Sequence, residues 1–225
     1  MPVPKESVAR AMASDSHRLI VFVKAPRPGA VKTRLAQTLG AATACDAYHQ
    51  LIATLLGRIA PLEGVELRYT PGDALPEIAP WVRAGWDAVA QGDGDLGERL
   101  ARAIREGFES GCRRVVVIGS DCPWMDAEDV RRAWEALEAD DVVLGPAMDG
   151  GYWLIGLKAP ANGLFQGIEW SSGSVFSQTV ERARSAGLTV HRLRELEDVD
   201  TEAAWRRFQE HFNPSRRSSR SGGRS

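Results

Sequence analysis

The sequence lacks long hydrophobic runs, a cysteine framework and any spaced set of histidines. No uninterrupted apolar run approaches the ~20 residues of a membrane-spanning helix, and residues 1–16 contain no apolar stretch like that of a signal peptide. The three cysteines form no C-x-x-C pair and the four histidines are scattered, which argues against a disulfide framework and a zinc site. We therefore expect a reduced, cytoplasmic protein that does not span a membrane.

Signatures of covalent hydrolases are missing as well. The chain contains no G-x-S-x-G motif, and no cysteine has a histidine nearby in sequence. A hydrolase that works through a covalent intermediate therefore has little support.

The 225 residues have an ordinary globular composition, with 44% hydrophobic and 26% charged residues. The net charge is −2, but residues 213–225 hold four arginines and no acid, so the rest of the chain carries −6. A chain of this length can form one large domain. We predict a flexible arm at 1–16, a single domain at 17–212 and a disordered basic tail at 213–225, with no nucleic-acid partner.

Apolar runs and amphipathic stretches alternate along the chain. The sequence predicts strands at 18–24, 64–69, 86–91, 113–119, 141–145, 152–157 and 188–193, separated mostly by helical stretches. The unbroken apolar run at 115–118 is typical of a central strand that is covered on both faces. This pattern predicts an α/β fold with a mostly parallel central sheet and helices on both faces.

Several polar residues fall at or just after the predicted strand ends. They are Lys24, Gln91, Asp121 and Asp149. Ligands of such sheets bind at the carboxyl ends of the strands. We therefore expect these four side chains to gather at one edge of the sheet.

Four cations, Lys24, Arg27, Lys32 and Arg34, lie within eleven residues at a predicted strand–loop–helix turn. The N-terminus of a helix carries unpaired N–H groups and partial positive charge, so it attracts anions and disfavours cations that have no anion beside them. The cluster favours binding of a nucleotide di- or triphosphate, with a solvated basic loop as the alternative. It is not a P-loop, because Val31 precedes Lys32 where that motif needs glycine.

Acidic residues follow the most apolar strand and precede the last predicted helix. Asp121 comes just after the strand at 113–119, and Asp198 and Asp200 lie in the motif D-V-D-T. Mg²⁺ takes one or two carboxylates together with phosphate oxygens of a substrate, so Asp121 with Asp198 or Asp200 could hold a metal. Asp200 and Thr201 could instead cap the helix, and Asp121 could bond its own turn. We favour the metal role for Asp121, because a charge that ends a buried strand is costly without a partner.

A glycine-rich turn at 91–99 leads into a predicted helix. Glycines such as Gly92 let the backbone approach a flat ligand, and the Gln91 amide can pair with the edge of a base. The alternative is a flexible turn in which Asp95 caps the helix.

A second turn, at 146–153, is a candidate surface for a sugar or a small acceptor. Gly150 and Gly151 permit close approach, and Tyr152 offers an apolar face with a polar tip. We place Trp170, which lies before the helix predicted at 174–186, at the same surface. The alternatives are a β-turn with core aromatic residues, and serines that only cap the later helix.

Five motifs follow one another between residues 18 and 212. They are F-V-K-A-P-R-P-G-A-V-K-T-R-L, Q-G-D-G-D-L-G-E-R-L, V-V-I-G-S-D-C-P, G-P-A-M-D-G-G-Y-W-L-I-G-L and I-E-W-S-S. Together they resemble a family of small bacterial candidate glycosyltransferases that is associated with arsenosugar biosynthesis. The resemblance implies a Rossmann-like glycosyltransferase-A (nucleotide-diphospho-sugar transferase) fold, which nucleotidyltransferases that activate sugars, molybdopterin and phospholactate share.

The resemblance also implies nucleotide binding at residues 24–34 and at Gln91, and a divalent metal at Asp121. D-V-D-T is similar to the second metal-side element of the nucleotidyltransferases. One departure concerns the metal strand, where S-D-C stands in place of the D-x-D that glycosyltransferases of this fold usually have. Nucleotidyl transfer therefore stays open.

We predict a metal-dependent glycosyltransferase that takes a nucleotide-diphospho-sugar donor and a small-molecule acceptor. Mg²⁺ or Mn²⁺ on Asp121 would neutralise the leaving diphosphate, and Asp149 would be the general base for the acceptor. One alternative is a nucleotidyltransferase that takes an NTP and a phosphorylated acceptor and releases pyrophosphate. The other is a non-catalytic nucleotide-binding protein, and a homodimer also stays open.

Overall fold

Seven strands form one sheet in which most neighbours are parallel. The structure is a computed structural model that describes residues 16–161 and 163–212. The strands are β1 (His17–Lys24), β2 (Val65–Thr70), β3 (Asp87–Ala90), β4 (Arg114–Ile118), β5 (Val142–Pro146), β6 (Tyr152–Leu157) and β7 (Val190–Arg192). Their order is β3-β2-β1-β4-β6-β5-β7, and β6 runs antiparallel to its neighbours β4 and β5.

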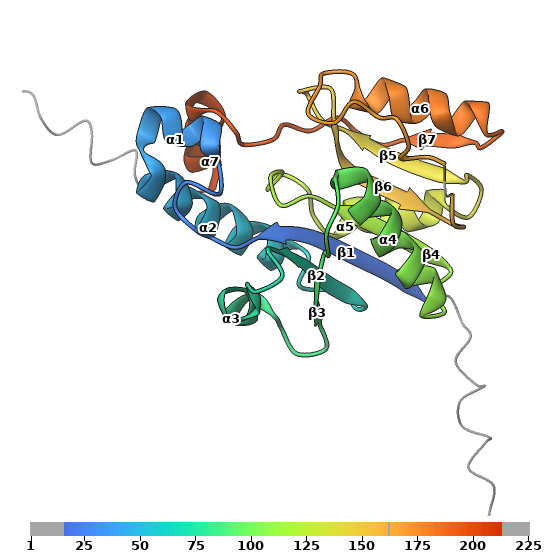
Figure 1. Cartoon of the computed structure of the whole chain (residues 1–225), viewed down its shortest axis with the longest axis horizontal. Helices are drawn as coiled ribbons and strands as arrows, with labels where there is room; N and C mark the ends of the chain where they lie inside the picture. Colours follow the sequence, from blue (N-terminus) through green and yellow to red (C-terminus); the bar gives the residue numbers. More distant parts are fainter. Residues whose placement is uncertain (1–15, 162, 213–225) are drawn as a thin grey trace, which may run out of the picture.

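Helices cover both faces of the sheet (Figure 1). They are α1 (Thr33–Leu39), α2 (Ala41–Arg58), α3 (Leu75–Ile78), α4 (Leu96–Glu109), α5 (Ala127–Ala136), α6 (Val175–Ser185) and α7 (Glu202–Phe212), with a 3-10 turn at Ala79–Trp81. Helices α2 and α5 share one core with Val21 and Val116, whereas α4 and α6 share another with Ile20 and Val117. The alternation of these residues along β1 and β4 puts the two cores on opposite faces. The predicted α/β fold, mostly parallel with helices on both faces, is confirmed.

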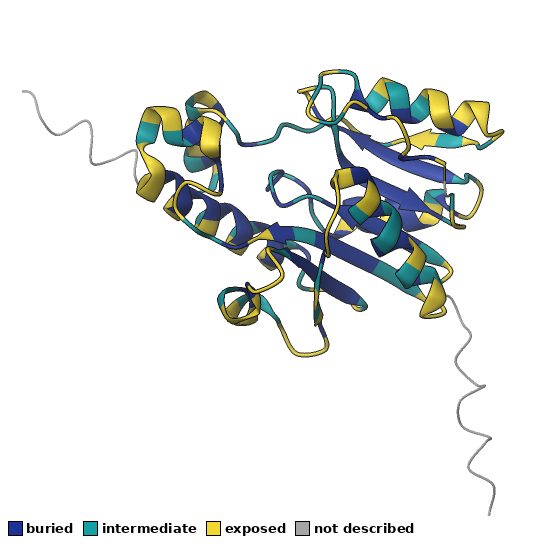
Figure 2. Cartoon of the chain, in the orientation of Figure 1, coloured by how far each residue is buried: buried dark blue, intermediate teal, exposed yellow. Residues whose placement is uncertain are grey.

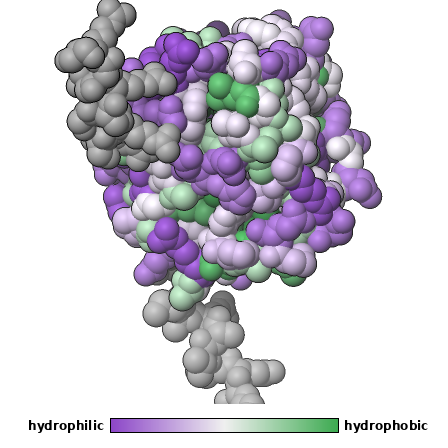
Figure 3. Space-filling model, turned by 90° about the vertical axis from the view of Figure 1, so that its left-hand side faces the viewer, coloured by the Kyte–Doolittle hydropathy of each residue, from purple (hydrophilic) through white to green (hydrophobic). Residues whose placement is uncertain are grey.

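The five inner strands are buried along most of their length, while the edge strands β3 and β7 and the outer sides of the helices are partly or fully exposed (Figure 2). Residues 115–118 of β4 are at most 3% exposed, as the unbroken apolar run predicts. Helices α1, α2 and α7 form a third apolar cluster, on the side of the molecule that Figure 3 faces, where the outer surface is mostly hydrophilic. None of the described helices is long and apolar enough to cross a membrane.

The predicted tail at 213–225 lies outside the described residues, and so does the predicted arm at 1–16 except for Ser16. The Ser16 hydroxyl donates to Gly111 O over 2.9 Å, and Ser16 O accepts from the Arg113 N–H over 2.9 Å. Ser16 is therefore tied to the turn before β4 and belongs with the folded part of the chain.

The antiparallel direction of β6 decides what lies at the ligand-binding edge of the sheet. Tyr152, the first residue of β6, pairs with Pro146, the last residue of β5. Leu154 pairs with Ile118, the last residue of β4. The start of β6 therefore lies beside the carboxyl ends of β4 and β5, and Tyr152 shares their edge.

Candidate functional site

A cavity of about 360 Å³ lies where β1, β4 and β6 meet the first turn of α4. Its lining combines apolar side chains with two cations and two carboxylates. The apolar ones include Phe22, Leu100, Tyr152, Ile155 and Trp170, and the charged ones are Lys24, Arg99, Asp121 and Asp198. The predicted strand-edge residues Lys24, Gln91 and Asp121 therefore meet at this cavity.

Lys32 lies between two of the predicted metal ligands. Its Nζ is 2.5 Å from Asp121 Oδ1 and 2.9 Å from Asp200 Oδ1, and its side chain is 1% exposed. Burial lowers the pKa of Lys32, but the two carboxylates outweigh burial and raise the pKa overall. Lys32 also has a left-handed backbone, with φ 50°, which is uncommon for a residue other than glycine and is frequent at functional sites. The structure thus places Lys32 at the site with its ammonium already engaged by carboxylates.

A backbone contact joins the segment 198–200 to the end of β4. The Val199 N–H donates to Asp121 O over 2.9 Å. Burial would raise the pKa of Asp121, but the charges of Lys32 and Lys24 lower it overall. The acids that the sequence predicts to act together are therefore neighbours, and Asp121 is ionised.

Asp198 has the features expected of a metal ligand. Its Oδ1 is buried and has no hydrogen-bond partner in the described part of the chain. Burial, and then the charges of Asp121 and Asp149, raise the pKa of Asp198 to about 7. Two carboxylates, Asp198 and Asp121, fit Mg²⁺ or Mn²⁺ that is also bound by substrate phosphate. Within 16–161 and 163–212, no group of three or more His, Cys, Asp or Glu side chains could hold a metal by itself.

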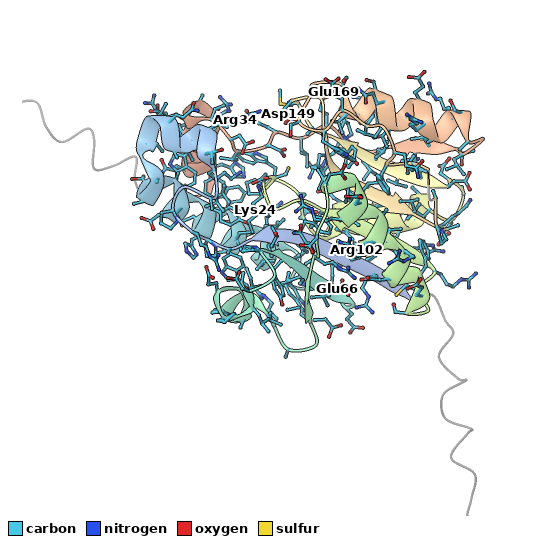
Figure 4. The ribbon with its side chains drawn as sticks, viewed as in Figure 1. Lys24, Arg34, Glu66, Arg102, Asp149 and Glu169 are labelled. Atoms are coloured by element: carbon cyan, nitrogen blue, oxygen red, sulfur yellow. The ribbon has the colours of Figure 1, made fainter. Side chains whose placement is uncertain are left out.

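The predicted basic cluster divides between the cavity and other contacts. Lys24 lines the cavity and forms no ion pair with the described residues. Arg27 turns toward α3, where its Nη2 lies 2.6 Å from Glu77 Oε1 and 3.2 Å from Asp73 Oδ1, so the structure does not bring it to the cavity. Arg34 is exposed on α1 and lies outside the cavity lining. Figure 4 labels Lys24 near the end of β1, with Arg34 and Asp149 above it.

Gln91 is buried, and its side-chain amide bonds to other residues of the protein instead of being free for the predicted contact with a base. Its Nε2 donates to Val23 O over 3.2 Å and to Arg68 O over 2.9 Å, and its Oε1 accepts from Arg99 Nη1 over 2.9 Å. Both amide hydrogens are therefore used within the protein. Gly92 has φ +76°, which explains the glycine, but it lies outside the cavity lining.

The predicted acceptor residues are only partly brought together. Tyr152 and Trp170 line the cavity, whereas Gly150 and Gly151 do not. A Cβ at Gly150 would lie 2.1 Å from Gly173 O, so glycine there lets the turn after β5 touch the segment before α6.

The proposed base Asp149 lies close to the cavity but outside its lining. Its side chain is exposed, and its Oδ1 accepts from the Gly151 N–H over 3.0 Å. Asp149 is near enough to Asp198 for its charge to raise the pKa of that residue.

Two of the residues for which helix capping was the alternative, Asp95 and Thr201, do cap a helix. Asp95 caps α4, where its carboxylate accepts from the Glu98 N–H. The Thr201 hydroxyl accepts from the Ala204 N–H over 3.2 Å at the start of α7. Asp200, in contrast, is bound to Lys32.

Sequence reasoning missed three residues of the site, Arg99, Tyr48 and Ser120. The buried Tyr48 hydroxyl accepts from the Lys24 N–H over 2.9 Å and lies 3.1 Å from Ser120 Oγ, which ties together the ends of β1 and β4. No local pattern links Tyr48, in the middle of α2, to those strands. Arg99 had a signal, because it follows the cap Asp95 by one helical turn inside Q-G-D-G-D-L-G-E-R-L.

We expect Tyr48→Phe to lower the free energy of unfolding by about 1–3 kcal/mol, because the Lys24 N–H would lose its acceptor in a partly buried hydrogen bond. The melting temperature should then fall by several degrees, at about 2–4 °C per kcal/mol for a chain of this size. Thermal unfolding measures this directly. Ser120→Ala keeps the bond between Tyr48 and Lys24 and should cost less, and an unchanged melting temperature in Tyr48→Phe would contradict this role of the hydroxyl.

Comparisons with known proteins bear on the family and the fold of this chain. Residues 58–172 match a family described as uncharacterized proteins conserved in bacteria (DUF2064). No curated protein matches the chain. A crystal structure from Desulfovibrio desulfuricans G20, described as a candidate nucleotide-diphospho-sugar transferase, is 39% identical over 83% of each chain, with a TM-score of 0.78.

Two more distant structures share the fold. A CMP:2-keto-3-deoxy-manno-octonic acid synthetase complexed with CTP is 10% identical over 89% of this chain and 100% of its own, with a TM-score of 0.55. A glucosyl-3-phosphoglycerate synthase from Mycobacterium tuberculosis, in complex with Mn²⁺, UDP and glucosyl-3-phosphoglycerate, is 12% identical over 83% and 71%, with a TM-score of 0.51. At these identities the similarity establishes a Rossmann-like fold of the glycosyltransferase-A type, as the sequence predicts, and nothing further.

Proposed function

The chain belongs to the bacterial DUF2064 family, and we propose that it is a metal-dependent glycosyltransferase with a nucleotide-diphospho-sugar donor and a small-molecule acceptor. The observation that carries this proposal is the meeting of Asp121, Asp198 and Lys24 at one cavity. The relative from Desulfovibrio desulfuricans, at 39% identity, supports this class of donor. The association with arsenosugar biosynthesis remains a proposal that rests on the sequence motifs.

Asp121 and Asp198 are the residues that would hold Mg²⁺ or Mn²⁺. The Oδ1 of Asp198 has no donor within the described part of the chain, and a cation would offset the repulsion among the carboxylates. When bound, the ion supplies positive charge for the leaving diphosphate. We leave Asp200 out of this pair because it lies outside the cavity lining, whereas Asp121 and Asp198 both line the cavity.

The remaining residues have roles in binding and orientation. Lys24, which is exposed and forms no ion pair with the described residues, would share the negative charge of the diphosphate with Lys32. Tyr152 and Trp170 offer aromatic faces for the sugar or the acceptor. Asp149 would accept the proton of the acceptor hydroxyl through Oδ2, because its Oδ1 is engaged by the Gly151 N–H.

A second candidate function is nucleotidyl transfer. It is favoured by the contact of the D-V-D-T segment with Asp121 through the Val199 N–H, and by S-D-C in place of D-x-D. In this reaction an NTP and a phosphorylated acceptor would react, and the same cations would stabilise the departing pyrophosphate.

One incubation separates these functions. The protein is mixed with labelled NTPs or with UDP- and GDP-sugars, each with Mg²⁺ or Mn²⁺. Free nucleoside diphosphate would support glycosyl transfer and pyrophosphate would support nucleotidyl transfer. Tight binding without turnover of any donor would indicate a non-catalytic nucleotide-binding protein.

A thermal-melt panel first identifies the nucleotide. A ligand at 100 times its dissociation constant should add roughly 2.7 kcal/mol to the free energy of unfolding. If no nucleotide or nucleotide-sugar stabilises the protein with either metal, the proposed function is wrong.

A further inference from the structure

Arg99 is, with Lys24, one of the two cations in the cavity lining. Its Nε donates to Asp95 O over 3.2 Å, and its Nη1 donates to Gln91 Oε1 over 2.9 Å. The guanidinium forms no ion pair with any residue in the described part of the chain. Its Nη2 donates to no residue in the described part of the chain, so both N–H groups of Nη2 are available to a ligand in the adjoining cavity.

A buried amide fixes the orientation of this guanidinium. Gln91 is 3% exposed, and its Nε2 donates to carbonyl oxygens of β1 and β2, those of Val23 and Arg68. Rotating the amide by half a turn would place Oε1 against two carbonyl oxygens, so Oε1 must face Arg99 as an acceptor. The side chain of Arg99 is thereby held in place before a ligand binds, which lowers the entropy cost of binding.

The surroundings of Arg99 strengthen its attraction for an anion. The side chains of Phe22, Leu96, Leu100 and Ile155 line the same cavity. Apolar walls exclude water, and the interaction between opposite charges is stronger where the local dielectric constant is low. The N–H donors of a guanidinium also form charge-assisted hydrogen bonds to the oxygens of a phosphate or a carboxylate.

We propose that Arg99, positioned by Gln91, binds an anionic group of the substrate, a phosphate or a carboxylate, in the cavity that Asp121 and Asp198 also line. The identity of the ligand rests on the proposed function, because either the phosphates of the donor or an anionic acceptor would supply this group. The existence of the subsite rests only on Arg99 and the cavity.

The test compares three variants with the parent protein. Arg99→Met removes the charge at similar length, and Arg99→Lys keeps the charge but not the planar fork. Arg105→Met is the matched control, because Arg105 lies on the same helix, is 54% exposed and pairs with Glu106 and Glu109. The probes are UDP, GDP and CDP with Mg²⁺, and inorganic phosphate added to the protein with and without each nucleotide, measured by calorimetry and by melting.

Two results would support the subsite. A loss of about tenfold to a hundredfold in nucleotide affinity in Arg99→Met, or ~1.4–2.8 kcal/mol, would identify a donor phosphate as the anion. Unchanged nucleotide affinity with loss of phosphate binding would identify an anion site for the acceptor. In either case Arg99→Lys should recover part of the affinity and Arg105→Met should behave like the parent. If Arg99→Met does not fold, Arg99→Lys takes its place, with weaker binding expected at an unchanged melting temperature.

Other results would contradict the proposed anion subsite at Arg99. The subsite is wrong if Arg99→Met binds both probes as tightly as the parent and Arg105→Met do, or if the parent binds neither probe. A parent that binds phosphate through Arg99 but binds no nucleotide would leave the subsite standing and remove the proposed function.

Discussion

Asp198→Asn is expected to raise the melting temperature of the metal-free protein while it removes most of the metal-dependent stabilisation by nucleotide. Burial and the charges of Asp121 and Asp149 raise the pKa of Asp198 from 3.8 to about 7. Ionising this carboxylate therefore costs stability. This cost is absent at pH values below the pKa that Asp198 has in the unfolded chain. It grows as the pH rises and is complete above the pKa that Asp198 has in the folded protein. A neutral asparagine avoids it.

The expected gain is about 1–3 kcal/mol at pH 8, because one pKa unit corresponds to about 1.4 kcal/mol and the amide must still be buried. The gain should disappear below about pH 4, where the carboxyl is protonated in both states. Melting curves from pH 4 to pH 8 without metal measure the gain, and a repeat with Mn²⁺ and a stabilising nucleotide measures the metal-dependent part. A metal-dependent part equal to that of the parent would remove Asp198 from the metal site.

Asp121→Asn is the variant to compare with Asp198→Asn. We expect it to lose the metal-dependent stabilisation by nucleotide in the same way, but to lower the melting temperature of the metal-free protein instead of raising it. From the sequence alone, Asp121 is a charge at the end of a buried strand with no partner, and its removal would leave the melting temperature near that of the parent or slightly above it. The structure changes that expectation, because Asp121 Oδ1 lies 2.5 Å from Lys32 Nζ. Removing the charge weakens this ion pair, so the metal-free variant should melt below the parent.

Lys32→Met is expected to lower both the stability of the protein and its affinity for nucleotide. Without the ammonium, Asp121 and Asp200 lie beside Asp198 with no bound cation between them. Removing one partner of a buried ion pair costs about 3–5 kcal/mol. We expect about 2 kcal/mol here, because the side chains of Asp121 and Asp200 are 47% and 33% exposed and solvent screens them. From the sequence alone, in which Lys32 is a loop cation, Lys32→Ala would be expected to keep the fold intact. The buried contact with Asp121 and Asp200 makes a loss of stability the expected result instead.

The stability loss in Lys32→Met has a defined pH dependence. The two carboxylates raise the pKa of Lys32, so its contribution is complete at neutral pH and is lost only as the pH rises through the folded pKa. Toward acid pH the difference from the parent should shrink, because the carboxylates become protonated. Melting curves and nucleotide titrations check both effects. Lys24→Met should weaken nucleotide binding without this loss of stability, and undiminished nucleotide affinity in Lys32→Met would refute the phosphate role.

Local composition was enough to predict the elements of the fold, but the direction of one strand needed a further step. The run at 115–118 and the cap Asp95 before α4 are local signals, and both agree with the structure. The antiparallel direction of β6 has no signal in its own residues. It follows from the short turn at 147–151, because a turn of a few residues can join antiparallel neighbours, whereas parallel ones need a long crossover.

The site was only partly predictable because its contacts join residues that are distant in sequence. Strand ends brought Lys24 and Asp121 to one edge, as the topology of an α/β sheet requires. The partners of Lys32 and Arg27 depend on how α7 and α3 pack beside the loop after β1, and no periodicity records that packing. Lone cations in a loop can therefore be predicted to meet anions, but the sequence does not say which anions.

The hairpin of β5 and β6 supplies a different part of the site from the elements that carry the proposed nucleotide-binding residues. The residues proposed for the nucleotide and its metal come from the ends of β1 and β4, from α4 and from the segment before α7, whereas Tyr152 and Trp170 come from the hairpin and from the segment before α6. We expect changes at Tyr152 and Trp170 to alter the proposed acceptor contacts while the proposed nucleotide contacts stay unaltered. A side chain larger than glycine at position 150 requires the segment 169–173 to move, because a Cβ at Gly150 would lie 2.1 Å from Gly173 O.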